Sequence, residues 1–155
     1  MKKLLITLAM LVAVPVAADG NFGVKVGQLV VDGAATDATQ AGLVYTWDFA
    51  GMFGAEAELN TSLAKGESVP GVEFSVNQFA AYGVFMTPGP IYLKAKAGLA
   101  YTDFNVDGGA GASSTDPVYG VGGGFEVFGI VMEVEYAIIS ADGGDADFIS
   151  VAIKF

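Results

Sequence analysis

The segment 148–155, with the sequence FISVAIKF, constrains the fold of this chain more than any other stretch. Because side chains alternate along a strand, it has one fully apolar face, whereas Ser150, Ala152 and Lys154 share the other. The apolar face carries Ile149, Val151, Ile153 and Phe155. A strand of this kind needs hydrogen-bonding neighbours on both edges and an apolar medium on one face. We therefore expect a closed β-barrel in a membrane.

The start of the sequence has the pattern of a secretory signal peptide. Lys2 and Lys3 precede an apolar run over residues 4–14, and small residues at 16–18 fit a signal-peptidase site. The apolar run is too short for a membrane helix, which needs about 20 residues. We predict that residues 1–18 are a Sec-type export signal cleaved after Ala18, and that residues 19–155 form one barrel domain.

The composition excludes several classes of protein. Without Lys2 and Lys3, five lysines and no arginine remain against 17 acidic residues, a net charge of −12. Such a chain repels nucleic acid, so we predict no nucleic-acid partner. The absence of cysteine excludes disulfides and a lipoprotein anchor. After the signal, no apolar run is long enough for a transmembrane helix, so membrane crossing would require strands.

Alternation with period two recurs along the rest of the chain and is broken by Gly, Pro, Asp and Ser clusters. It predicts strands of about the 9–11 residues that a membrane strand needs. Short connections alternate with longer ones, as in outer-membrane barrels. The expected fold is an all-β, eight-stranded antiparallel up-and-down transmembrane β-barrel. Its expected strands cover residues 22–31, 39–49, 53–63, 72–86, 91–103, 118–128, 130–139 and 148–155.

The fourth expected strand has mixed parity. Phe74 shares a face with Val76, whereas Phe79 and Phe85 share the other. Either a β-bulge near residues 77–78 or two inward phenylalanines would account for this pattern.

The polar faces of the strands combine glycines with long charged side chains. A surface in water has no need of small residues, whereas the narrow lumen of an eight-stranded barrel does. The charges on this face nearly balance in sign, and charges removed from water must pair. We therefore predict a lumen charge network that plugs the barrel. Its members are Lys25, Asp48, Glu56, Glu58, Lys94, Lys96, Glu126, Glu133, Glu135 and Lys154.

Aromatic residues gather near both ends of the expected strands. Two belts at the depth of the lipid head groups would have this distribution. One belt comprises Phe22, Trp47, Phe49, Phe53, Phe85, Phe125 and Phe155, and the other Tyr101, Tyr119 and Tyr136.

Three stretches resemble a known family: YGVGGGFEVFG at 119–129, MEVEYAII at 132–139 and the final FISVAIKF. They are similar to the small outer-membrane β-barrel family that includes the OmpA transmembrane domain, the opacity proteins and related eight-stranded porin-family proteins. The resemblance covers residues 19–155. It implies a monomer integral to the outer membrane, in contact with lipid and lipopolysaccharide.

The resemblance also implies assembly partners. In that family, periplasmic chaperones and the barrel-assembly machinery receive the chain, and the final strand is read by strand pairing. Carried over to this sequence, the assembly signal consists of Ile149, Val151, Ile153 and Phe155.

Catalysis, cofactors and specific metal binding are not expected. Outer-membrane hydrolases and acyltransferases of similar fold depend on histidine, and this chain has neither histidine nor cysteine. The Glu56/Glu58 and Glu133/Glu135 pairs fit a structural network better than an acid–base couple. Several aspartates offer hard oxygen ligands, but their spacing is not that of an EF-hand and suits turns. They are Asp103, Asp107, Asp142, Asp145 and Asp147.

The predicted function is therefore a structural envelope role with a plugged lumen and at most a small channel. The alternative is an adhesin or surface-recognition protein that binds through extracellular loops at 104–117 and 140–147. A third class is a soluble periplasmic carrier with its apolar face inward.

Replacing Phe155 with alanine is expected to reduce assembly, because it removes the aromatic end of the predicted signal. Lys154→Met, one residue earlier, is expected to assemble but to unfold more readily, because it leaves inward carboxylates unpaired. The measurement is the fraction of membrane protein whose gel migration changes on boiling. Wild-type assembly of Phe155→Ala would contradict the assigned role of the terminal aromatic.

Overall fold

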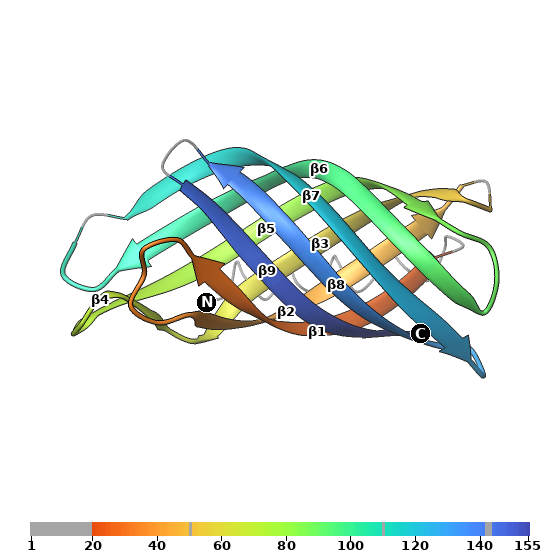
Figure 1. Ribbon diagram of the computed structural model, residues 1–155, viewed down its shortest axis with the longest axis horizontal. Helices are drawn as coiled ribbons and strands as arrows, with labels where there is room; N and C mark the ends of the chain where they lie inside the picture. Colours follow the sequence, from red (N-terminus) through yellow and green to blue (C-terminus); the bar gives the residue numbers. More distant parts are fainter. Residues whose placement is uncertain (1–19, 50, 110, 142–143) are drawn as a thin grey trace, which may run out of the picture.

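The computed structural model describes residues 20–49, 51–109, 111–141 and 144–155. The predicted signal peptide with Ala18 lies outside the described residues, as does Asp142. No helix in the described part of the chain is long and apolar enough to cross a membrane. The described chain consists of strands joined by turns and short loops (Figure 1). The strands are β1 (Gly20–Val31), β2 (Ala38–Asp48), β3 (Phe53–Ala64), β4 (Gly66–Val69), β5 (Val72–Met86), β6 (Ile91–Val106), β7 (Ala112–Val127), β8 (Ile130–Ala141) and β9 (Gly144–Lys154).

The strands form one closed antiparallel barrel. Their order is β3-β2-β1-β9-β8-β7-β6-β5-β4, and β3 also pairs with β5, which closes the ring. The short β4 pairs with β5 beyond the end of β3, so eight long strands make the wall. The first and last strands meet where the Phe22 N–H donates to the Phe155 carbonyl at 3.1 Å and the Phe155 N–H donates back at 2.8 Å. The predicted fold class is confirmed.

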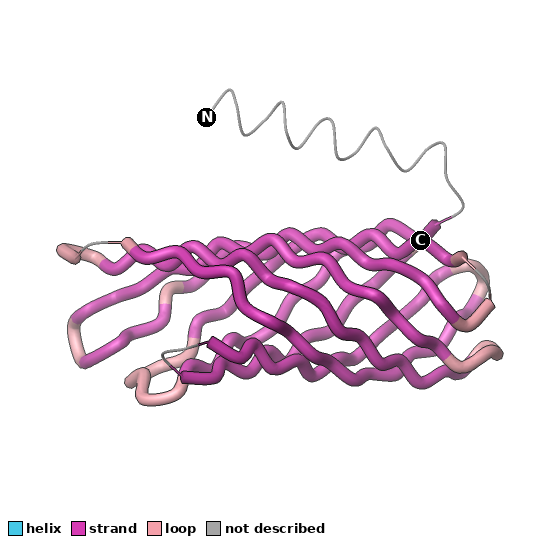
Figure 2. Tube along the Cα trace, turned by 90° about the horizontal axis from the view of Figure 1, so that it is seen from above, coloured by secondary structure: helices cyan, strands magenta, loops and turns pink. Residues whose placement is uncertain are grey.

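The barrel has two different ends, seen at left and right in Figure 2. The turn end carries the start of β1, the end of β9 and the β2–β3, β5–β6 and β7–β8 connections. The loop end carries the β1–β2 loop, β4 and the β6–β7 connection.

The predicted long loops at 104–117 and 140–147 are wrong in length. β6 and β7 pair as far as Phe104 with Ala112, and β8 and β9 as far as Ala141 with Gly144. The Ser, Asp and Gly content of these segments is typical of turns. The adjacent strand nevertheless offers a complete ladder of backbone partners, and this long-range pairing overrides the local preference.

Pro117 lies inside β7 and not in a connection, which corrects the expectation. It is opposite Leu99 on β6. On the β8 side the ladder begins only at Val118, so the N–H that proline lacks is not needed there.

The fourth predicted strand, now β5, contains no bulge near residues 77–78. Its register with β6 runs without a shift from Phe74 to Met86. Phe74 is buried inside the barrel, whereas Phe79 and Phe85 are exposed on the outside. An inward phenylalanine, not a bulge, accounts for the mixed parity.

The outer surface of the barrel is apolar. Leu93 and Val121 keep 69% and 60% of their surface exposed, and large apolar side chains are also exposed on each of the other long strands except β2. This polarity is the reverse of a soluble carrier's, whose apolar residues would face inward. An apolar surface of this extent is stable only against another apolar phase.

Aromatic side chains lie on this outer surface at the turn end, where Phe22 and Phe155 pack edge to face with centroids 6.0 Å apart. Phe53 and Phe85 make a second such pair at 5.4 Å. Tyr101, Tyr119 and Tyr136 of the other predicted belt are also exposed on the outside.

Replacing the outward Val121 with lysine is expected to destabilise the folded barrel in lipid by about 2–4 kcal/mol, the cost of a cation on the lipid face near mid-bilayer. The measurement is equilibrium urea unfolding in phospholipid vesicles. Val121→Leu serves as the control and is expected to unfold like wild type. Equal stability of the lysine variant would mean that this face meets water.

Candidate functional site

The most unusual feature of the interior is a buried network of charged side chains from five strands. Acids come from β3 and β8, and lysines from β1, β6 and β9. Each residue is between 1% and 5% exposed. The network comprises four glutamates and four lysines, so its formal charge is zero. These residues are Lys25, Glu56, Glu58, Lys94, Lys96, Glu133, Glu135 and Lys154.

The layer nearest the turn end centres on Glu56. Its carboxylate accepts from Lys94 Nζ at 2.5 Å and from Lys154 Nζ at 2.9 Å. Thr46 Oγ1 donates to the same carboxylate at 2.8 Å. Across the lumen, Glu133 forms ion pairs with both Lys94 and Lys154. The two lysines therefore bridge carboxylates on opposite walls.

The next layer repeats the arrangement with the other members. Lys25 Nζ lies 2.5 Å from carboxylate oxygens of both Glu58 and Glu135. Lys96 Nζ contacts the same two residues at 2.5 and 3.0 Å. Lys94 joins the layers through a 2.6 Å contact with Glu135. Every ammonium group thus has at least two carboxylate partners, which offsets the cost of removing it from water.

Two predicted members, Asp48 and Glu126, do not belong to the network. Both have the inward parity, but both are exposed at the turn end, and neither forms an ion pair within the described part of the chain. Asp48 is the last residue of β2, and Glu126 precedes the last residue of β7. Water reaches the barrel mouth and solvates these carboxylates, so they have no need of a lysine.

The sequence reasoning missed the neutral groups that complete the lumen. Asn60 Nδ2 donates to Glu58 Oε2 at 3.3 Å and to Gln78 Oε1 at 3.2 Å. The Tyr82 ring lies 4.2 Å from Lys96 Nζ, a cation–π contact. Asn60, Gln78 and Tyr82 all have the inward parity of β3 and β5, so strict alternation along these strands could have identified them.

The glycines of β7 make room for the charged side chains. A Cβ on Gly120 would lie 3.0 Å from Lys96 Cε, and one on Gly122 would lie 3.0 Å from Glu135 Cγ. The lumen is thus filled to the wall on the β7 side. This is the arrangement expected of an interior only wide enough for side chains.

The loop-end half of the lumen is largely apolar, although Asp116 of β7 is also buried there. The buried cluster there includes Leu29, Val76, Val118 and Ile139, and Phe148 lies at its border with the network, 5.6 Å from Lys25 Nζ. Apart from the possible inward phenylalanines of the fourth expected strand, the sequence predicted glycines and charged side chains in the lumen and no apolar half. The barrel is therefore closed twice, by ion pairs toward the turn end and by packed apolar side chains toward the loop end.

The fifth lysine after the signal lies outside the lumen, at the loop end. Lys65 Nζ is 2.5 Å from Asp107 and 3.1 Å from Glu73. Hydrogen bonds to Asp107 and Glu73 raise the pKa of the Lys65 ammonium group above its ordinary value. Both partners are exposed, so water screens this cluster.

Three lumen carboxylates are close enough together to share a metal ion. Oxygens of Glu56, Glu133 and Glu135 lie within 4.8 Å of one another. Lys94 Nζ, however, lies at 2.5 to 3.2 Å from all three residues. The ammonium group supplies the positive charge that a cation would bring, so the arrangement is that of an ion-pair network.

No protein-family model and no curated protein sequence matches the chain. Solved structures do. The Neisserial surface protein NspA matches with a TM-score of 0.63 and 14% identity over 87% of this chain and 94% of that one. The attachment invasion locus protein Ail of Yersinia pestis, in complex with the heparin analogue sucrose octasulfate, matches with a TM-score of 0.58 and 15% identity. The match covers 87% of this chain and 94% of that one. The outer membrane enzyme PagL matches with a TM-score of 0.54 and 18% identity, over 87% of this chain and 98% of that one. The chain has the fold of these small eight-stranded outer-membrane β-barrels.

Removing one lysine from the network is expected to be costly, because it leaves a buried carboxylate without its partner. Lys96→Met should lower the free energy of unfolding by about 3–5 kcal/mol. Adding Glu58→Gln restores the charge balance and should recover part of the loss. The matched control, Lys65→Met, removes an exposed lysine and should change little. Urea unfolding in vesicles measures all three, and equal effects at Lys96 and Lys65 would contradict a buried network.

Proposed function

We propose that this chain is an integral outer-membrane β-barrel with a structural role in the envelope and a lumen sealed by its own side chains. The apolar outer surface and the fold shared with outer-membrane barrels support this placement. Each of the eight long strands, as far as it is described, pairs with a neighbour on both sides, which favours a monomer.

The observation that carries the proposal is the network of four lysines between glutamates on opposite walls. An open pathway at this level requires several short ion pairs to separate in a buried site. Leaving even one such charge without its partner costs about 3–5 kcal/mol. The packed apolar half above the network adds a second closure. A steady water-filled pore is therefore not the resting state of this barrel.

Export and assembly belong to the same proposal. A Sec-type signal over residues 1–18 would bring the chain to the periplasm, where chaperones and the barrel-assembly machinery would receive it. The pairing of Phe155 with Phe22 supports a role for the final strand, because that strand closes the ring. Lipid and lipopolysaccharide are the proposed partners of the outer surface.

We further propose that the barrel is not an enzyme. The likeness to PagL means that the fold is compatible with catalysis. This chain lacks histidine and cysteine, and each glutamate of the lumen charge network is held by lysine. A group that accepts and returns protons must be free to do so near neutral pH, and the paired network offers none.

Adhesion through the loops, the alternative function, has weaker support. The β6–β7 connection is confined to residues 107–111, far shorter than the predicted loop. Ail was solved with a sulfated heparin analogue. The acidic loop end of this chain would repel such a polyanion.

Planar-bilayer recording tests the sealed lumen. Wild type is expected to show no large, steady channels. A variant that truncates both seals, Lys96→Ala with Glu58→Ala and Phe148→Ala, is expected to conduct more often, because water can then enter both halves. Phe79→Ala, which truncates an outward residue, is the control and should behave as wild type. Large, steady channels in wild type would end the proposal.

A further inference from the structure

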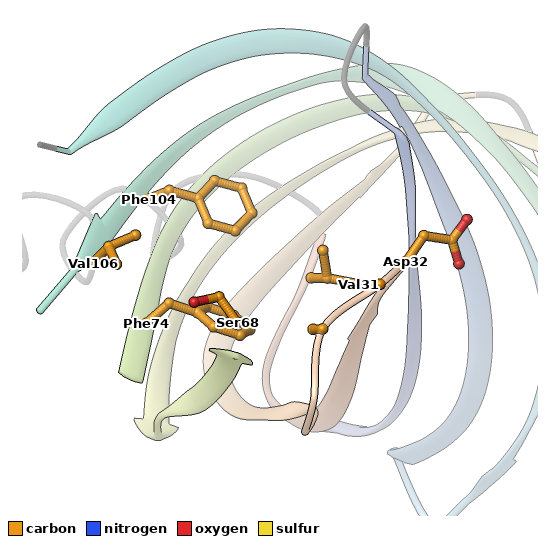
Figure 3. Close-up of a pocket in the computed structure, with 8 residues that line it drawn as sticks. Val31, Asp32, Ser68, Phe74, Phe104 and Val106 are labelled. Carbon is orange, nitrogen blue, oxygen red and sulfur yellow. The ribbon is translucent and has the colours of Figure 1, made fainter. Parts of the chain in front are cut away.

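A cavity of about 180 Å³ opens at the loop end, on the far side of the apolar half from the charge network. Figure 3 shows Phe74 and Phe104 on one side of it, Val31 on the other and Ser68 between them. The two phenylalanine rings have centroids 6.2 Å apart and are tilted by 39°. Its lining residues are Val31, Asp32, Gly33, Ala34, Ser68, Phe74, Phe104 and Val106.

The walls of the cavity are held in place by backbone hydrogen bonds. The β1–β2 loop is fastened to β4, since the N–H groups of Ala35 and Thr36 donate to the Glu67 carbonyl at 2.7 and 3.1 Å. The Glu67 N–H in turn donates to Thr36 Oγ1 at 2.9 Å. These contacts join segments 31 residues apart in sequence. The cavity is therefore a preformed space and not a gap between loose loops.

A glycine fixes the position of one aromatic wall. Phe74 packs directly over Gly66 of β4, where a Cβ would lie only 2.4 Å from the ring. Phe74 is also buried against the apolar cluster beneath it. The floor of the cavity is consequently rigid and apolar.

The rim of the cavity is acidic. Asp32 is among the lining residues, with its carboxylate pointing away from the two aromatic rings (Figure 3). Glu67, Glu73 and Asp107 are each adjacent in sequence to a lining residue, and Glu73 and Asp107 are exposed. Lys65, the lysine of this rim, is held by Glu73 and Asp107. The field at the entrance therefore attracts cations and repels anions.

We propose that this cavity binds a small organic cation, an ammonium group carried on an apolar body about the size of a phenyl ring. An apolar protein cavity of about 150 Å³ is known to take up benzene, so the space fits such a body. The faces of Phe74 and Phe104 attract both an apolar ring and a nearby cation. The ammonium group would remain at the mouth, in water and within the field of the nearby acidic residues.

This inference goes beyond the structural role and does not depend on it. The cavity lies at the opposite end of the barrel from the lumen charge network, so a ligand can enter and leave without crossing the lumen. If bilayer recording showed large channels, the sealed-lumen proposal would fail, but ligand binding would still be decided separately by titration.

Titration of the folded barrel in detergent, followed by amide NMR shifts, tests the proposal with three probes of one shape. Phenethylammonium is expected to bind, phenethyl alcohol to bind more weakly and hydrocinnamate to bind least. The preference for the cation should shrink at high salt and in Asp32→Asn, because both weaken the field at the rim. Equal binding of the three probes, or tighter binding of the anion, would overturn the assignment.

A filling variant locates the site. Ala34→Trp places a large side chain in the cavity and should weaken phenethylammonium binding by about tenfold or more, a loss of at least 1.4 kcal/mol. Val106→Trp fills it from another wall and is the second variant if the first does not fold. Ala97→Trp adds the same ring to the outer surface and controls for partition into detergent. Undiminished binding in a folded filling variant would overturn the proposal.

Discussion

A strand surrounded by lipid has no water to satisfy its backbone, so each of its amides must be paired by a neighbouring strand. In this chain the requirement is met by a ring that closes between β1 and β9. Closure also determines where every side chain goes. Because residues alternate across a strand, half of them face outward and must be apolar, and the other half share a lumen too narrow for free water.

The charges of the lumen network balance. Four buried glutamates on β3 and β8 are paired with four buried lysines on β1, β6 and β9. Of the remaining acids, Asp116 is buried on the inner face of β7 and accepts from Ser114 Oγ at 2.5 Å. Several others are exposed near Asp32 and Asp107 at the loop end. The acidity of that rim and the neutrality of the plug are therefore two results of one constraint, since only one further lysine remains after the signal.

Much of this could be predicted from the sequence because period-two alternation is a local signal. It identified the outward face of β9, and it placed eight of the ten predicted charges on the side where the structure brings them together. It failed where the outcome depends on distant partners. Asp48 and Glu126 have the inward parity but lie where water replaces the lysine. Most of the expected loop at 104–117 is strand, because β6 and β7 pair beyond their expected ends. The contact between Thr36 and Glu67, and with it the cavity, has no counterpart in any local pattern.

The interior differs between the two ends of the barrel. A solute arriving at the loop end meets a shallow apolar cup with a solid floor, whereas one arriving at the turn end meets charged side chains that are already bound to each other. The cavity is thus open to one side of the membrane only. A ligand bound there would enter and leave through the same opening, so the occupancy of the cavity would depend on the ligand concentration on that side alone.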